Sequence, residues 1–203
     1  LDVGALVAST ARQANLGADG AWTFSDKGTG QVINQGYIQA RGDGQKGGFV
    51  VLDSAAQTSN SGTLEALRGG VALTVAQNTR IALDAQGLLN VSVDGVVLNA
   101  LVQNQGLILA DGGAVYLSAR GKDMLLASVI NQTGIVRARS VQNQNGRIIL
   151  SGGDSGTVQV SGTLDASGNA AGQSGGGIEV TGQNIQLSQA TLDASGYSAG
   201  GSV

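Results

Sequence analysis

The pattern that recurs through this chain is clearest in Asn104-Gln105-Gly106-Leu107-Ile108-Leu109-Ala110, which runs directly into Asp111-Gly112-Gly113-Ala114-Val115-Tyr116-Leu117. Related copies of the first half close at Ala40, Ala66, Ala110, Ala138, Ala166 and Ala194, so successive copies lie 26, 44, 28, 28 and 28 residues apart. A period of this size indicates stacked structural units, because each unit can bury its apolar face only against its neighbours.

Each copy alternates between a strict apolar column and a permissive column. The residue two positions before the closing alanine is aliphatic in every copy, namely Ile38, Leu64, Ile108, Val136, Leu164 and Leu192. The residue between them is Gln39, Glu65, Leu109, Arg137, Asp165 or Asp193. The second half of the unit alternates alike, with permissive positions at Val51, Ala72, Tyr116, Ile149 and Glu179. A period of two with one apolar column indicates half-buried strands.

A third, weaker strand follows in several copies, at 81–83, 158–160 and 185–187. Three short strands per coil, separated by glycine-rich corners and repeating about every 28 residues, predict an all-β parallel β-helix, a solenoid. The repeated Asn-Gln-Gly runs predict corner hydrogen bonds between stacked coils, and asparagine ladders that bind a ligand are the alternative. Glycines in general are expected to supply corners where the backbone turns with positive φ.

Composition supports this fold and limits the available chemistry. The 203 residues include 34 Gly, no Pro, no Cys and no His, and 41% of them are hydrophobic. The absence of proline protects strand ladders, in which every central N–H needs a partner. A net charge of −3 with scattered basic residues predicts no nucleic-acid partner, and no apolar run is long enough to predict membrane insertion.

The spacing divides the chain in two. Residues 1–103 are expected to form an irregular β-helix, with a surface excursion and polar turn in 11–30 and an extra hairpin or irregular coil near 86–102. In that hairpin, Asp94-Gly95 would be the turn between two strands. Residues 104–203 are expected to be regular repeats truncated in mid-coil, because the pattern stops where the next strand is due.

The permissive positions, which are expected to point outward, suggest two electrostatic contacts between neighbouring coils. With a 28-residue register, Arg137 lies next to Asp165 and predicts an exposed ion pair. Asp165 and Asp193 then stack as like charges, which would either recruit a cation or remain two solvated carboxylates; the second is the simpler interpretation. No cofactor is predicted.

The short motif Arg41-Gly42-Asp43 lies in a glycine-rich step that is longer than its counterparts, so a protruding loop is expected. Such a motif is a candidate integrin-binding site, in which the Asp carboxylate would complete a metal site on the receptor. A chance occurrence in a sequence rich in Gly and Asp is the simpler explanation. Arg41, Gly42 and Asp43 are therefore the candidate binding residues.

Several blocks together resemble filamentous-haemagglutinin-type exoproteins of two-partner secretion: residues 1–10, 22–24, 32–36, 47–52, 87–93 and 112–117. The resemblance covers essentially the whole chain and places it where the secretion domain closes and the shaft begins. It implies a right-handed β-helix, export through an outer-membrane transporter barrel, and a secreted protein on the surface of a Gram-negative bacterium. The family's Asn-Pro-Asn-Gly secretion motif is not present in these residues.

The resemblance implies a structural and adhesive shaft segment, with a host-cell receptor or an extracellular polysaccharide as partner, and with attachment or biofilm cohesion as its role. The shaft of a contact-dependent toxin-delivery exoprotein is an alternative within the same family. A carbohydrate-processing β-helix enzyme is an alternative of another class, suggested by fold analogy. The 14 acidic residues are scattered without the spacing of a catalytic cluster, so no enzyme is expected.

Overall fold

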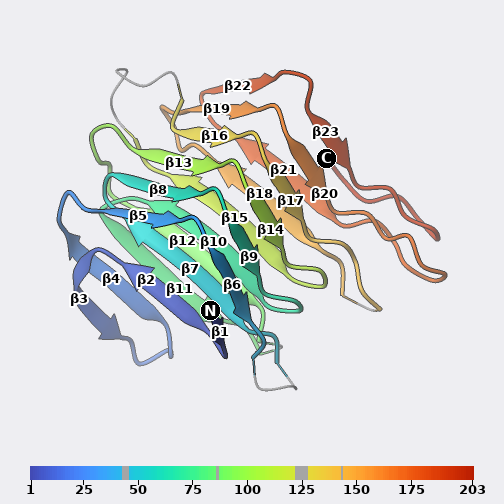
Figure 1. Ribbon diagram of the computed structural model, residues 1–203, viewed down its shortest axis with the longest axis horizontal. Coiled ribbons are helices and arrows are strands. Elements are labelled where there is room, and N and C mark those ends of the chain that lie inside the picture. Colours follow the sequence, from blue (N-terminus) through green and yellow to red (C-terminus); the bar gives the residue numbers. More distant parts are fainter. Residues whose placement is uncertain (43–45, 86, 122–127, 143) are drawn as a thin grey trace.

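Three parallel sheets wind around one apolar interior in the computed structural model, which describes residues 1–203 except 43–45, 86, 122–127 and 143 (Figure 1). The chain visits the three sheets in turn and then begins the next coil, so the predicted parallel β-helix with three strands per coil is confirmed. Val136 pairs with both Ile108 and Leu164, and Leu164 pairs with Leu192, which confirms the 28-residue register.

The strands of each parallel sheet stack in coil order. The seven-stranded sheet consists of β1 (Asp2–Val3), β6 (Tyr37–Ala40), β9 (Thr63–Glu65), β14 (Leu107–Leu109), β17 (Ile135–Arg137), β20 (Thr163–Asp165) and β23 (Thr191–Asp193). The covered sheet consists of β2 (Leu6–Ser9), β7 (Phe49–Ser54), β10 (Gly70–Val75), β15 (Ala114–Ala119), β18 (Arg147–Ser151) and β21 (Gly177–Thr181). The ladder sheet consists of β5 (Gln31–Asn34), β8 (Gln57–Asn60), β13 (Leu101–Asn104), β16 (Ile130–Gln132), β19 (Thr157–Val160) and β22 (Asn184–Leu187).

The strict apolar columns fill the interior. Leu64, Ile108, Val136 and Leu164 stack along the seven-stranded sheet with no exposed surface. Burying an aliphatic side chain of this size contributes about 1.5–3 kcal/mol before chain entropy is subtracted. Each coil therefore depends on its neighbours for most of its stability.

A column of amides runs along the end of the ladder sheet. The side chains of Asn34, Asn60, Asn104 and Gln132 form successive hydrogen bonds of 2.8, 2.8 and 2.9 Å from one coil to the next. These side chains are buried, so the ladder satisfies polar groups that would otherwise be costly in the interior. The hydrogen bonding expected from the Asn-Gln-Gly corners is confirmed.

The expected positive φ occurs at seven described glycines, among them Gly42 and Gly112, but the glycines beside this ladder have another role. Gly62, Gly106, Gly134 and Gly162 are absent from the residues with positive φ. A Cβ on any of these four would lie 2.0–2.1 Å from the carbonyl oxygen of the corresponding glycine in the preceding coil. Close backbone approach at the corner, and not left-handed conformation, excludes a side chain there.

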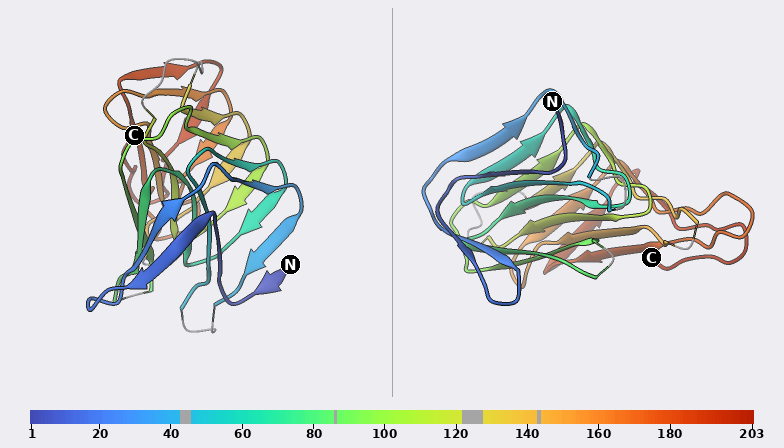
Figure 2. Two further views of the ribbon diagram at one scale, coloured as in Figure 1. Left: turned by 90° about the vertical axis from the view of Figure 1, so that its left-hand side faces the viewer. Right: turned by 90° about the horizontal axis from the view of Figure 1, so that it is seen from below.

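A fourth sheet, which is antiparallel, lies outside the β-helix. This outer sheet has the order β12 (Leu89–Asp94), β11 (Asn78–Leu83), β4 (Trp22–Lys27) and β3 (Ala11–Leu16), and it packs on the outer face of the covered sheet (Figures 1 and 2). A second apolar cluster fills the interface and comprises Val51, Ala72, Ile81, Leu89, Val91, Ala114 and Tyr116. The outward column of the covered sheet is permissive in sequence, yet it is largely buried here.

Two expected details of this region are wrong. The 81–83 segment belongs to β11 of the outer sheet, and the third strand of its coil is β13. The hairpin consists of β11 and β12, so its turn lies before Leu89 and not at Asp94-Gly95. Asp94 is the last residue of β12, and the only strand partner of β12 in the described chain is β11. Residues 11–30 form the β3–β4 hairpin of the same sheet. The division into 1–103 and 104–203 stays a prediction.

Candidate functional site

The predicted Arg41-Gly42-Asp43 site is only partly described, because Asp43 lies outside the described residues. The exposed Arg41 guanidinium donates from Nε to Asp2 Oδ1 at 3.1 Å and to Gln39 Oε1 at 3.0 Å. Gly42 has a φ of +71°, and its N–H donates to the Gly4 carbonyl oxygen at 3.0 Å. Gly42 is thus required by the backbone, while integrin binding stays a prediction.

The charged column beside the seven-stranded sheet pairs differently from the expectation. Arg137 is opposite Asp165 in the strand register, but its guanidinium donates twice to Asp111, at 3.0 and 2.8 Å. Asp165 instead accepts a 2.7 Å hydrogen bond from Arg139. The predicted Arg137–Asp165 pair is therefore wrong, because the long side chain of Arg137 reaches Asp111 in the turn after β14, while Arg139 reaches Asp165.

The stacked carboxylates of Asp165 and Asp193 are adjacent in the register, as the spacing predicts. Hydrogen bonds from the Ser195 side chain and backbone lower the pKa of Asp193. Asp165 accepts hydrogen bonds from the Ser167 hydroxyl and backbone N–H as well as from Arg139. No group of three potential metal ligands occurs among the described residues.

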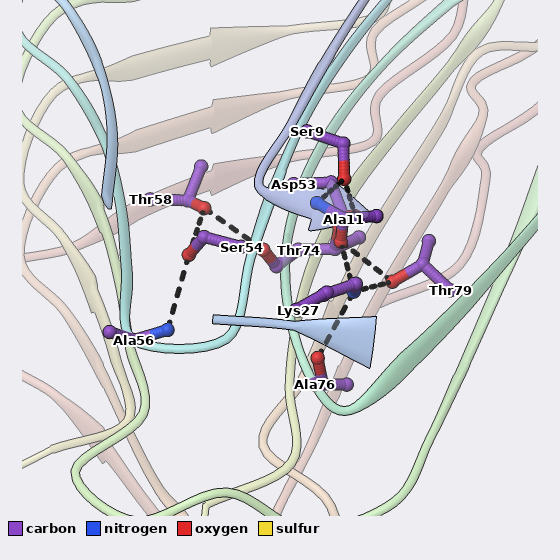
Figure 3. A network of polar contacts seen from close by, with 10 residues as sticks. All are labelled: Ser9, Ala11, Lys27, Asp53, Ser54, Ala56, Thr58, Thr74, Ala76 and Thr79. Carbon is purple, nitrogen blue, oxygen red and sulfur yellow. Dashed lines mark hydrogen bonds and ion pairs between the residues drawn. The ribbon is translucent and has the colours of Figure 1, made fainter. Parts of the chain in front are cut away.

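The most developed polar cluster is one that the sequence did not reveal, a buried ion pair between Lys27 and Asp53 (Figure 3). Lys27 is the last residue of β4, and Asp53 lies in β7. Their side chains have no exposed surface, and Nζ is 2.6 Å from Oδ1. The expected polar surface turn around Lys27 is therefore wrong, since the outer sheet carries this residue into the interface with the β-helix.

All three ammonium protons of Lys27 have acceptors. Beyond Asp53, they reach the Ala76 carbonyl oxygen at 3.0 Å and Thr79 Oγ1 at 2.8 Å. Burial lowers the pKa of Lys27, and the Asp53 carboxylate opposes this shift.

Hydroxyl groups complete the cluster around the carboxylate. Ser9 donates to Oδ2 of Asp53 at 2.6 Å, and Thr74 and Thr79 each donate to Oδ1 at 2.7 Å. A fully satisfied pair that solvent does not reach cannot exchange protons with a substrate. The cluster instead joins β2, β4, β7, β10 and β11, so its chemistry is structural.

A groove of about 420 Å³ runs along the outer face of the covered sheet, beside the edge of β12. Its floor includes Ser118 of β15 and Ile149 and Ser151 of β18, while Arg147 and Glu179 lie at its rim. The Tyr116 hydroxyl at one side donates to the Leu89 carbonyl oxygen at 3.0 Å and holds β12 onto β15. This groove therefore brings together the backbone edge of β12, the small side chains of Ser118 and Ser151, and charged side chains at its rim.

Another groove of about 560 Å³ lies where β4 leaves the outer sheet. It is lined by Gly28, Thr29 and Asn78 together with the exposed apolar side chains of Val96 and Leu98. The lining carries no cluster of ionisable groups beyond Asp26 and the already paired Lys27. Its composition suits a contact surface better than a catalytic pocket.

Comparison with known proteins adds a relationship in sequence. No family model matches this chain. The chain is 32% identical to a heme/hemopexin-binding protein of Haemophilus influenzae strain Rd over 142 residues, which are 70% of this chain and 15% of that protein. A second heme/hemopexin-binding protein from Haemophilus influenzae is 32% identical over 81 residues, 40% of this chain and 8% of that protein. The chain thus spans less than a sixth of the length of the curated relatives it matches, and its similarity is to a limited part of them.

Proposed function

We propose that this chain is a rigid β-helical shaft segment of a secreted bacterial surface protein, which holds binding surfaces away from the cell and takes part in attachment. The observation that carries the proposal is the unbroken stacking of all three parallel sheets, with a continuous apolar interior and an amide ladder from Asn34 to Gln132. Each added coil lengthens such a stack by about 4.8 Å. This architecture favours reach and stiffness.

The proposal includes the two-partner-secretion route and an outer-membrane transporter as the partner in export. The recurring blocks that resemble filamentous-haemagglutinin-type exoproteins support it, and so does the 32% identity to a Haemophilus heme/hemopexin-binding protein. Within the described part of the chain, no helix has the length and apolar character needed to cross a bilayer.

The name of the two relatives suggests two candidate ligands for this chain, haem and the protein hemopexin. Haem iron is held by His, Cys, Met or Tyr side chains. This chain has no His or Cys, and its single Met, Met124, lies outside the described residues. Of the three tyrosines, Tyr116 and Tyr37 donate their hydroxyl protons to the Leu89 carbonyl oxygen and to Glu65, whereas the side chain of Tyr197 is 71% exposed. Among the described residues, axial haem ligation would therefore rest on Tyr197, a surface side chain that lines none of the grooves described above, and a protein partner is the better candidate for this segment.

A catalytic role has less support than a binding role. Among the described carboxylates on or beside the seven-stranded sheet, Asp111 pairs with Arg137, Asp165 pairs with Arg139, and Asp193 accepts a hydrogen bond from the Ser195 N–H. A glycoside hydrolase needs two carboxyl groups facing a substrate across about 5–10 Å. We therefore include in the proposal that this segment is not an enzyme; a toxin-delivery shaft would share the same scaffold and differ only in its cargo.

The test is a binding comparison with the purified chain immobilised at defined density. Cultured epithelial cells, hemopexin, haem and a polysaccharide array are applied to the chain. Asp43→Ala is compared with Asp154→Ala, which removes a different carboxylate; the side chain of Asp154 is fully exposed. We expect saturable binding to cells or to hemopexin, no change in the haem absorption band, and no release of sugar products.

Each opposite result has a defined meaning. A haem spectrum typical of axial ligation, or progressive cleavage of a polysaccharide, would contradict the proposal. An absence of binding to cells and to every protein and glycan tested would contradict the adhesive role and leave only a spacer. Loss of cell attachment in Asp43→Ala but not in Asp154→Ala would support the predicted integrin site.

A further inference from the structure

We propose that the groove beside β12 is a docking site for an extended strand of another protein, which joins the outer sheet as its next strand. β12 is the last strand of the outer sheet in the described part of the chain, because it pairs with β11 alone. One side of its backbone is thus available to a new partner, as on any edge strand. This inference goes beyond the shaft role and does not depend on the export route.

The covered sheet already provides a floor for that added strand. β12 packs on β10 and β15, while β18 and β21 continue the covered sheet beyond it (Figure 1). The outer face of β18 and β21 therefore lies next to the edge of β12. A strand added to that edge would lie over this face and direct its inward side chains toward it. An incoming strand would extend an interface that is already established between the two sheets.

The side chains on the floor suit an extended peptide. Ile149 is half-buried and packs against the apolar cluster under the outer sheet, so it can receive an aliphatic side chain. Ser118 and Ser151 are small and leave room above them in a groove of about 420 Å³. Because strand side chains alternate between faces, every second residue of the partner would point to this floor.

The direction of the backbone groups supports the same site. The Leu89 carbonyl oxygen accepts the hydrogen bond from the Tyr116 hydroxyl, so it is directed to the groove side of β12. Backbone groups of alternate residues in an antiparallel strand point to the same edge. Val91 and Val93 therefore present their N–H and C=O groups to the groove that they line.

A second copy of this chain is a less suitable occupant than a single segment. If two outer sheets met edge to edge at β12, each molecule would bring its own covered sheet to the level of β18 and β21 of the other. When the two β12 edges pair antiparallel, both solenoids lie on the same side of the joined outer sheets, and these strands collide because they extend past β12. A single extended segment is thin enough to enter.

An oligosaccharide fits less well than a peptide. Sugar rings commonly bind against the open face of an aromatic side chain, but Tyr116, the aromatic residue of this groove, is only 8% exposed. The groove is lined by two arginines, Arg120 and Arg147, and by one carboxylate, Glu179, so its excess positive charge favours a peptide that carries a carboxylate. Arg147 is 60% exposed, and its contact with Glu179 is long, at 3.7 Å. Arg120, at the other end, is likewise 3.8 Å from Asp154. The partner is thus an extended segment with aliphatic residues at alternate positions and at least one Asp or Glu.

The experiment selects a random display library of eight-residue peptides on the purified chain, with counter-selection on Ser151→Trp. That substitution fills the floor of the groove with a large ring. Ile33→Trp is the matched control, because Ile33 is an exposed residue on the ladder sheet, outside the groove. Arg147→Glu reverses the charge at the rim without changing the floor. Thermal unfolding establishes that every variant is folded.

Enriched peptides are resynthesised, and their affinity is measured by fluorescence anisotropy. We expect binding to the wild-type chain and to Ile33→Trp with equal affinity, a loss of at least about tenfold in Ser151→Trp, and weaker binding of acidic peptides to Arg147→Glu. Peptides methylated at alternate backbone nitrogens should also lose at least about tenfold, since added strands bind through main-chain hydrogen bonds. Hydrogen exchange should slow at Val91 and Val93 only in the complex.

Three results would overturn the proposal. The first is that no peptide is enriched over the counter-selection. The second is that the methylated peptides bind as tightly as their parents, which would exclude strand addition. The third is that an oligosaccharide array, and not the peptides, gives a signal that Ser151→Trp abolishes, which would assign the groove to a sugar.

Discussion

Lys27→Met removes a buried ammonium group while it keeps a side chain of similar length. Asp53 is then left as a buried carboxylate without its counter-charge, and the Ala76 carbonyl oxygen loses a donor. Removing one partner of a buried pair commonly costs about 3–5 kcal/mol. The hydroxyls of Ser9, Thr74 and Thr79 still donate to Asp53, so we expect the lower end of this range.

A loss of about 3 kcal/mol in a domain of this size lowers the melting temperature by roughly 6–12 °C. The assay is thermal and urea unfolding followed by circular dichroism, with hydrogen exchange to locate the change. Because Lys27 ends β4, the β3–β4 hairpin should exchange faster than the coils of β17 to β23. Asp53→Asn and the double variant complete a cycle, in which the double variant should be less destabilised than the sum of the two.

The matched control is Arg80→Met, which breaks the Arg80–Asp19 pair in the same outer sheet. Those side chains are 47% and 60% exposed, so the change should cost less than about 1 kcal/mol. If Lys27→Met proves as mild as Arg80→Met, or if the hairpin exchanges no faster, then the pair is not buried as described. The assignment of the cluster to a structural role would then be refuted.

Three further changes test other parts of the fold. Leu164→Ala leaves a cavity in the fully buried interior column and should cost about 2–5 kcal/mol in urea unfolding, whereas a loss below 1 kcal/mol would contradict its position. Asn104→Leu breaks the amide ladder toward Asn60 and Gln132 and should cost about 2–4 kcal/mol in the same assay. Burial raises the pKa of Tyr116 above its usual 10.0, so the folded state keeps this proton longer than the unfolded chain. The contribution of neutral Tyr116 to the free energy of unfolding is complete below pH 10 and is lost as pH rises through the raised pKa of the folded state. Tyr116→Phe should reduce this loss of stability at alkaline pH, as measured by unfolding experiments.

The repeat made the β-helix predictable. Aliphatic residues at Leu64, Ile108, Val136 and Leu164 recur at fixed positions, and in a solenoid equal positions become vertical neighbours. The amide ladder followed from the same rule, because Asn104 recurs as a side-chain amide at Gln132. Both inferences needed only local alternation and a period, which a sequence displays directly.

Parts of the candidate sites were not predictable in this way. The exact partner of a long charged side chain depends on reach, so Arg137 bonds to Asp111 although the ladder places Asp165 beside it. The groove beside β12 could not be foreseen either. Its signal in the sequence was the outward column of Tyr116 and Ile149, which is more apolar than an outward column usually is.

The sequence by itself determined the solenoid, its three strands per coil, its 28-residue register and its interior columns, because these rest on contacts between equivalent positions of a repeat. Only the tertiary structure decided the outer sheet, the Lys27–Asp53 pair and the groove. These features join β4 to β11 and β7, segments from different coils with no repeat relation between them. Such antiparallel pairing depends on how a whole face is covered, and no local period records it.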